Sequence, residues 1–142
     1  MKLQTINAIA GVLSGMKINK IADKGVKTVL VNDYLLLRKI VKEADDERKE
    51  LIEKFQSDWR DELSAVEAFR KEGKTVEGHE AYLEAERDAN NALSEIMGKD
   101  IDVSLSAVDA NPLYDADLWP DDITLEQIPR SVDFLKENGI VV

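Results

Sequence analysis

VKTVLVNDYLLLRKIVKEADDERKELIEKFQSDW, residues 26–59, is the stretch that decides the fold of this 142-residue chain. Its apolar residues recur every three or four positions without an intervening proline, which is the pattern of one amphipathic helix roughly 50 Å long. Because helical stability comes mostly from packing the apolar face, this stripe predicts a partner: another part of the chain, another copy, or another protein. The stripe comprises Val26, Val29 or Leu30, Asp33, Leu37, Ile40, Ala44, Glu47 or Arg48, Leu51, Phe55 and Trp59.

Composition indicates a single domain. The chain is 44% hydrophobic and 34% charged, which is typical of a soluble globular protein. It has no cysteine, so disulfides and thiolate chemistry are excluded and a cytoplasmic setting is the default. No apolar run approaches the roughly 20 residues of a membrane span, and the polar residues of 4–7 interrupt the apolar start that a signal peptide needs. We expect one domain over residues 1–142, with a helical body to residue 98 and an acidic α/β tail from residue 99.

The net charge of −10 is unevenly distributed. Residues 1–38 hold six basic and two acidic residues, whereas residues 99–142 hold three basic and ten acidic residues. The favoured interpretation is that these two ends face water or each other, and the alternative is that the acidic end meets a basic partner. Direct nucleic-acid binding is not expected, because phosphate affinity requires clustered Lys and Arg.

Further helices are predicted on both sides of the stripe. Residues 3–13 show helical spacing, and a second helical pattern begins near Ile18. Gly25 lies inside this second pattern and predicts a bend or a close backbone approach. Beyond Trp59 the helix either continues to about residue 72 or restarts with Ser57-Asp58 as its cap, and the sequence leaves both possibilities open.

Residues 80–97 predict the helix that covers part of the stripe. An alanine-rich seam of the coiled-coil kind runs along it at spacings of three and four. Its small side chains complement the bulky residues of the stripe, so an antiparallel hairpin closed by a turn at residues 73–78 is expected. The seam consists of Tyr82, Ala85, Ala89, Ala92 and Ile96.

The last third of the chain predicts a small β element and short helices. Ile101, Val103 and Leu105 alternate with polar residues, the period-two pattern of a half-buried strand. Its mate is residues 140–142, a strand of a partner subunit, or a strand near the N-terminus. Thr124 with Gln127, and separately residues 131–138, predict short helices. The expected fold is mainly α: a long antiparallel helical hairpin with a short N-terminal helix and this C-terminal α/β region.

Catalytic and metal-binding patterns are absent from the sequence. His79 is the only histidine, so a two-histidine metal site is excluded, and we expect it at the surface. There is no GxSxG, HExxH, GxxxxGK[ST] or GxGxxG motif. The acidic residues of 115–122 lack the glycine and closing glutamate of a calcium-binding EF-hand loop. We therefore expect no enzyme, no cofactor, no metal and no small-molecule substrate.

Polar residues interrupt the stripe at Asp33 and at Glu47-Arg48. The favoured interpretation is that they are solvent-facing edges of an imperfect seam. Alternatively, a buried polar residue fixes helix register and partner choice at a cost in stability. In that case Asp33→Leu raises stability and loosens the oligomeric state. Trp119, in an acidic loop before Pro120, is either a core residue or an exposed anchor for a partner.

Four segments together resemble small uncharacterised proteins encoded by tailed phages and prophages. The resemblance lies in the order of these parts and spans most of the chain, without an invariant motif. It implies an accessory protein without assigned catalysis in the host cytoplasm, and it supplies no functional residues. The segments are Val12-Leu13-Ser14-Gly15, the basic stretch from Lys17 to Lys27, the helix through Glu47-Arg48-Lys49-Glu50-Leu51-Ile52, and Asp100-Ile101-Asp102-Val103-Ser104-Leu105.

The favoured function is a non-catalytic interaction or assembly protein that acts through helical packing. Self-association into a homo-oligomer through the hairpin seam is the expected mode, and another protein is the other possible partner. One alternative is an acidic, nucleic-acid-mimicking inhibitor of a DNA-handling enzyme, and a second is a metal-dependent enzyme using clustered carboxylates. The residues expected to carry the packing are Leu37, Ile40, Leu51, Phe55, Ala85, Ala89, Ala92 and Trp119.

Overall fold

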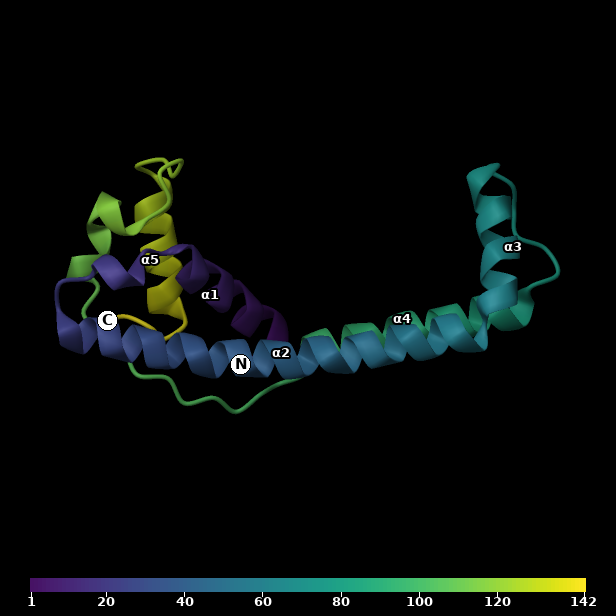
Figure 1. Ribbon diagram of the computed structural model, residues 1–142, viewed down its shortest axis with the longest axis horizontal. Coiled ribbons are helices and arrows are strands. Elements are labelled where there is room, and N and C mark those ends of the chain that lie inside the picture. Colours follow the sequence, from purple (N-terminus) through teal and green to yellow (C-terminus); the bar gives the residue numbers. More distant parts are fainter. The chain divides into compact units, whose positions relative to one another are not determined.

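The computed structural model describes residues 1–142 and is built mainly of helices, which confirms the fold class (Figure 1). No helix, the 35-residue α2 included, combines the length and apolar character needed to cross a membrane. The α-helices are α1 (Leu3–Gly15), α2 (Lys24–Asp58), α3 (Arg60–Lys71), α4 (Glu80–Gly98) and α5 (Gln127–Glu137), and the short 3-10 helices are η1 (Ile18–Lys20), η2 (Asn111–Tyr114) and η3 (Ala116–Leu118).

The chain divides into two compact units. Unit 1 comprises Met1–Val41 together with Asp100–Val142, and unit 2 comprises Lys42–Lys99. Helix α2 contributes its first part to unit 1 and its second part to unit 2. The division therefore falls inside the long helix, whereas the sequence placed a change from helical body to tail at residue 98.

Helix α2 begins at a cap that the sequence reading missed. Asp23 Oδ1 accepts hydrogen bonds from the backbone N–H groups of Gly25 at 2.9 Å and Val26 at 3.2 Å. A helix start leaves its first N–H groups without helical partners, and an aspartate just before the helix satisfies them. The predicted helical pattern from Ile18 is instead interrupted: η1 ends at Lys20 and α2 starts at Lys24, so Gly25 lies in a first turn and not at a bend.

Unit 1 holds a well-buried apolar core. One cluster joins residues of α1, the first part of α2, η2, η3, α5 and the C-terminal segment, and Figure 1 shows these elements gathered around α1 and α5. Burying such side chains is the main source of fold stability. Its fully buried members are Ile6, Ile9, Leu13, Leu30, Leu37, Leu113, Val132, Leu135 and Ile140, each with an exposed fraction of 0%.

The predicted strand at residues 101–105 does not form, so this part of the prediction is wrong. Half-buried Ile101, Val103 and Leu105 alternate with exposed residues as expected, but the segment is extended chain without a strand partner. Isolated bridges lie only at its two ends, Lys2 with Asp100 and Val108 with Val141. A strand needs a continuous ladder of backbone hydrogen bonds to a neighbour. Here Ile101 alone exchanges hydrogen bonds with Met1, and the backbone N–H of Ser106, just after the segment, donates to Asp33 Oδ1 of α2 at 3.1 Å.

The two short helices predicted near the C-terminus form a single helix, α5. The backbone N–H of Thr124 donates to Gln127 Oε1 at 2.8 Å, which is one half of the predicted capping box. At the other end, Gly139 has φ +76°, a left-handed conformation that glycine adopts without strain. The chain then returns into the core at Ile140, whose N–H donates to the carbonyl of Leu135 at 3.0 Å.

Unit 2 consists of the second part of α2 with α3 and α4. Helix α2 ends at Asp58, and Trp59, with φ −121° and ψ 23°, separates it from α3. The structure thus has a break between two helices rather than one helix running to residue 72. Helix α4 lies alongside α2 and α3 stands across this pair (Figure 1), so the expected pairing of the long helix with residues 80–97 is present.

Candidate functional site

The centre of unit 2 is the buried ring of Tyr82. It has an exposed fraction of 0% and is the only large side chain besides Val66 that unit 2 buries completely. Its ring lies 5.5 Å from the ring of Phe55 and 5.9 Å from that of Trp59, measured between centroids, the latter edge to face. Such aromatic pairs add stability beyond burial of area. Tyr82 therefore fixes α4 against the end of α2 and the start of α3.

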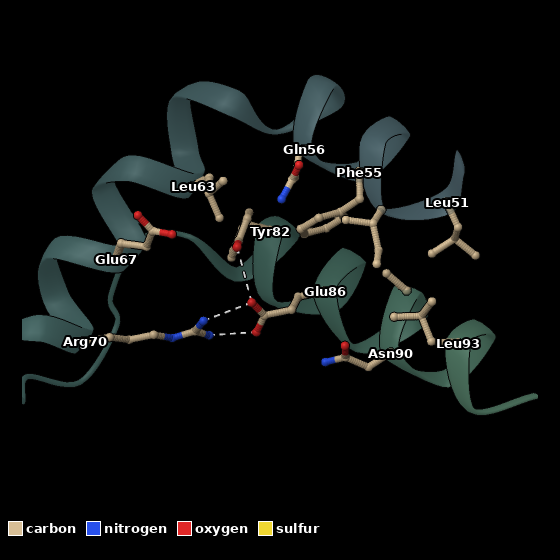
Figure 2. Close-up of a pocket in the computed structure, with 12 residues that line it drawn as sticks. Leu51, Phe55, Gln56, Leu63, Glu67, Arg70, Tyr82, Glu86, Asn90 and Leu93 are labelled. Carbon is tan, nitrogen blue, oxygen red and sulfur yellow. Dashed lines mark hydrogen bonds and ion pairs between the residues drawn. The ribbon is translucent and has the colours of Figure 1, made fainter. Parts of the chain in front are cut away.

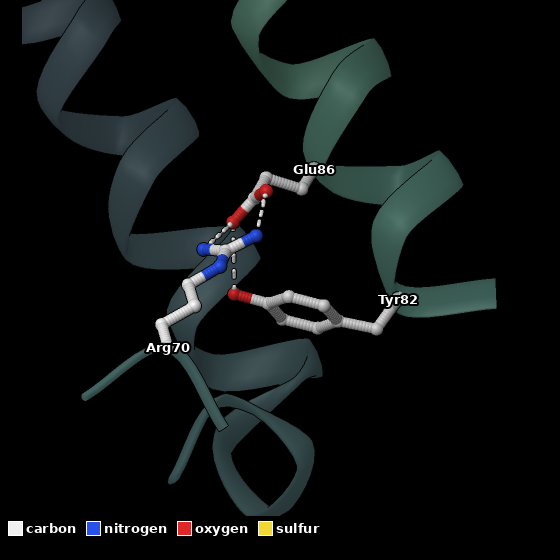
Figure 3. Close-up of polar contacts among 3 residues, drawn as sticks. All are labelled: Arg70, Tyr82 and Glu86. Atoms are coloured by element: carbon white, nitrogen blue, oxygen red, sulfur yellow. Dashed lines mark hydrogen bonds and ion pairs between the residues drawn. The ribbon is translucent and has the colours of Figure 1, made fainter. Parts of the chain in front are cut away.

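The hydroxyl of Tyr82 belongs to a polar cluster that we call the clamp, consisting of Arg70, Tyr82 and Glu86 (Figure 3). Arg70 Nη1 donates to Glu86 Oε2 at 2.9 Å and Arg70 Nη2 donates to Glu86 Oε1 at 2.7 Å. The Tyr82 hydroxyl donates to Glu86 Oε2 at 3.2 Å. This bidentate geometry is the strongest form of an arginine–carboxylate pair, and it ties α3 to α4.

The electrostatics of the clamp follow from these contacts. Hydrogen bonds from Arg70 hold the pKa of the Glu86 carboxyl below its ordinary value. Burial, together with the nearby Glu86 charge, raises the pKa of the Tyr82 hydroxyl. Glu86 thus stays ionised and Tyr82 stays protonated at neutral pH. Neither group is prepared for proton transfer, and the clamp is a structural tie between helices.

Beside the clamp lies a groove with a volume of about 280 Å³, formed by all three helices of unit 2 (Figure 2). Leu51 and Phe55 approach it from α2, Leu63 from α3, and Tyr82 and Leu93 from α4. The remaining lining residues are Ile52, Gln56, Glu67, Arg70, Glu86, Ala89 and Asn90. Apart from Tyr82, the apolar side chains of this groove are half-buried or exposed, and Ile52 is 42% exposed.

The residues expected to carry packing fall into both units. Leu51, Phe55 and Ala89 meet in the groove, and Ala92 lines a neighbouring hollow of about 290 Å³ with Leu51. Ala85 is half-buried on the same face of α4. Leu37 instead belongs to the core cluster of unit 1, and Ile40 is half-buried against that cluster. The apolar stripe of α2 is covered in its first part and left partly open in its second.

Trp119 is a core residue and not an exposed anchor. It has an exposed fraction of 3% and lies in the core cluster of unit 1. Its indole Nε1–H donates to the carbonyl of Leu113 at 2.7 Å, which satisfies the only polar group of the ring. The sequence left both possibilities open, and the neighbouring Leu118 is also buried, so the acidic loop around Trp119 turns its apolar side chains inward.

The prediction that the polar positions of the stripe face solvent is wrong at Asp33. Its exposed fraction is 5%, and one oxygen, Oδ1, accepts a hydrogen bond from the backbone N–H of Ser106 at 3.1 Å. The other oxygen, Oδ2, is buried without a hydrogen-bond partner. Burial raises the pKa of the Asp33 carboxyl, an effect that the Ser106 hydrogen bond partly opposes.

The second polar interruption of the stripe is the pair Glu47-Arg48. Glu47 is exposed, whereas Arg48 is half-buried. The Arg48 guanidinium donates to Asp45 one helical turn away and to Met97 Sδ of α4 at 3.3 Å, while its Nε is buried without a partner. Its long side chain thus lies along α4 instead of pointing into water.

The acidic side chains and His79 are the remaining candidates for a metal site. No group of three or more His, Cys, Asp and Glu side chains is placed to hold a metal ion. His79 is half-buried rather than at the surface: its Nδ1 lies 3.2 Å from Glu62 Oε2, and its ring packs edge-on against Phe69. The groove and the clamp are therefore the features of the chain that suggest a function. Sequence reasoning missed the clamp, because nothing marks Arg70 and Glu86, 16 residues apart, as partners.

Comparisons with protein-family models, with curated proteins and with solved structures found no match to this chain. The class of protein is therefore defined by its structure alone. It is a mainly α protein in which α2 is shared by unit 1, which has a well-buried apolar core, and unit 2, which buries few apolar side chains.

Proposed function

We propose that this chain is a non-catalytic interaction protein that binds other protein chains, copies of itself included, through helical packing in unit 2. The open groove is the observation that supports this proposal. Unit 2 contains only three of the 21 buried apolar residues of the chain, Ala44, Val66 and Tyr82. The remaining apolar side chains of its three helices are still partly in water. Exposed apolar surface in a concave site is the usual mark of a binding surface.

The structure offers less support for the alternatives. A nucleic-acid mimic needs a continuous negative face, but basic residues are interspersed on unit 2 and pair with acids, as in Arg70–Glu86 and Lys49–Glu53. An acid–base enzyme needs a group whose pKa lies near neutral pH, whereas the lowered pKa of Glu86 and the raised pKa of Tyr82 both move away from neutral pH. The phage-related accessory role stays a proposal that rests on resemblance of the sequence.

Site-specific photo-crosslinking tests the proposal. A benzophenone amino acid replaces Ile52, which is 42% exposed in the groove, or Leu125, which is 83% exposed in unit 1 and serves as the control. In cells that produce the protein, we expect crosslinked protein adducts at position 52 and none at position 125. An adduct at about twice the chain mass of 15.9 kDa identifies self-association. Absence of adducts at position 52, or equal adducts at both positions, would contradict the proposal.

A further inference from the structure

The walls of the groove carry lining side chains at the three- and four-residue spacings of a helix surface. On α2, Leu51 and Phe55 lie four residues apart, and on α4 the lining residues Tyr82, Glu86 and Ala89 follow at spacings of four and three. Two such rows of side chains form the ridges into which a third helix packs its own residues. An amphipathic helix in an apolar groove is a recurring mode of protein recognition. No strand or open sheet edge lies in unit 2 that could pair with an extended peptide instead.

The charged side chains of the groove lining indicate which sign of charge a partner should carry. The groove is lined by three charged residues, Glu67, Arg70 and Glu86. Both terminal nitrogens of Arg70 are held by Glu86, so these two charges neutralise each other within the clamp. Glu67 is exposed and forms no ion pair, and its charge adds a smaller contribution to the raised pKa of Arg70, which the hydrogen bond with Glu86 dominates. The three charges of the lining sum to one negative charge, and its exposed carrier is Glu67.

Unit 2 as a whole has the same sign. Residues 42–99 contain 17 acidic and ten basic residues, which gives a net charge of −7. A basic partner is attracted by this net charge, and an acidic one is repelled. Contact between this groove and the same groove of a second copy brings together two Glu67 carboxylates and two units of equal net charge, so it is disfavoured at low salt.

We propose that this groove binds an amphipathic helix of another protein, one that carries lysine or arginine beside its apolar face. This inference rests on the function proposed above and specifies its partner. The apolar residues of that helix pack against Leu51, Phe55 and Leu93, and one of its cations pairs with Glu67. The clamp residues line the groove as well, and the Arg70–Glu86 pair ties together α3 and α4, two of the helices that form it.

Defined peptides test the inference with the full-length chain. The probe is a fluorescent 18-residue helical peptide with leucine at positions i, i+4 and i+7 and lysine at the flanking positions, and the matched probe has glutamate in place of every lysine. Fluorescence anisotropy at 50 mM and 300 mM NaCl gives the dissociation constants. We expect the basic peptide to bind at least tenfold more tightly than the acidic one at 50 mM, and the difference to shrink at 300 mM.

Variants locate the binding in the groove. Glu67→Gln removes the unpaired carboxylate and should weaken the basic peptide about two- to fivefold, as expected for one exposed ion pair. Glu84→Gln, an exposed residue of α4 outside the groove, is the matched control and should leave binding unchanged. Ile52→Ser should weaken both peptides, because it removes apolar surface from the lining without changing its charge.

Three results would overturn the inference: equal binding of the two peptides at 50 mM salt, no binding of either, or equal effects of Glu67→Gln and Glu84→Gln. Crosslinks at position 52 without binding of the basic peptide would leave the interaction function standing and refute the basic helix as its partner. A crosslinked adduct consisting only of two copies of this chain would show that a second copy occupies the groove.

Discussion

Replacing Asp33 by asparagine should stabilise the protein in a pH-dependent manner. Asparagine has nearly the same shape, and its Oδ1 can still accept the hydrogen bond from the N–H of Ser106. The substitution replaces the other carboxyl oxygen, Oδ2, by an amide nitrogen. In the native chain Oδ2 is buried without a hydrogen-bond partner. An unpartnered buried neutral group costs about 1–3 kcal/mol and an unpartnered charge costs more. We therefore expect Asp33→Asn to raise the free energy of unfolding at pH 7 by about 1 kcal/mol.

The sign of the pH dependence follows from the raised pKa of the Asp33 carboxyl in the folded state. Between the ordinary value of 3.8 and the folded value, the folded chain binds this proton more often than the unfolded chain does. The native carboxyl therefore destabilises the fold increasingly as pH rises through this interval. Its contribution changes by at most about 1.4 kcal/mol per pH unit. Below pH 3.8 both side chains are neutral, and the advantage of asparagine should disappear.

Urea unfolding followed by circular dichroism from pH 4 to pH 8 measures this difference. Effects of all other carboxyls cancel when the variant is subtracted from the native chain. Asp46→Asn, at an exposed position of α2, is the control and should show no pH-dependent difference. Parallel stability curves for the native chain and Asp33→Asn, or a less stable variant at pH 7, would refute the account of Asp33 as a buried carboxyl whose ionised form is unfavourable.

Four further substitutions, each measured by urea unfolding, examine the local structure of unit 1. Asp23→Ala removes the side-chain cap of α2 and should lower the free energy of unfolding by about 1 kcal/mol, and an unchanged value would mean that the cap is not formed. Trp119→Phe leaves the buried carbonyl of Leu113 without its donor and should cost about 1–3 kcal/mol. Gly139→Ala forces a side chain into φ +76° and should cost about 1–2 kcal/mol, whereas Gly11→Ala, in the interior of α1 with open space around it, should gain about 1 kcal/mol.

The sequence predicted those elements whose evidence is local. Helical spacing located α1, α2 and α4, because a stripe at intervals of three and four is a property of one segment alone. The seam of α4 also faces inward as predicted, with Tyr82 buried and Ala85, Ala89 and Ala92 half-buried. The break at Trp59 could not be decided, because the same residues suit a continuous helix and a restarted one.

Long-range pairings could not be predicted, because a stripe does not encode which surface covers it. Leu37 and Leu51 occupy equivalent positions of one pattern, yet the first is fully buried in unit 1 and the second is half-buried in unit 2. Alternation at Ile101 correctly indicated which residues face inward. It could not show that no second strand pairs with this segment. The backbone N–H of Ser106, which follows it, instead donates to the Asp33 carboxyl of helix α2.

The unequal burial of the two parts of α2 gives unit 2 a physical reason to bind. Its helices have aligned their apolar faces and ordered Tyr82 and the clamp, so part of the entropic cost of forming a binding surface has been met in the free chain. The apolar surface that remains in water at Leu51, Ile52 and Phe55 yields free energy only when something covers it. A partner that binds the folded form alone therefore stabilises unit 2 by mass action. On this argument, occupation of the groove should raise the protection of the α3 and α4 amides from hydrogen exchange more than that of the α1 amides. Equal increases in all three helices would show that binding does not act through unit 2.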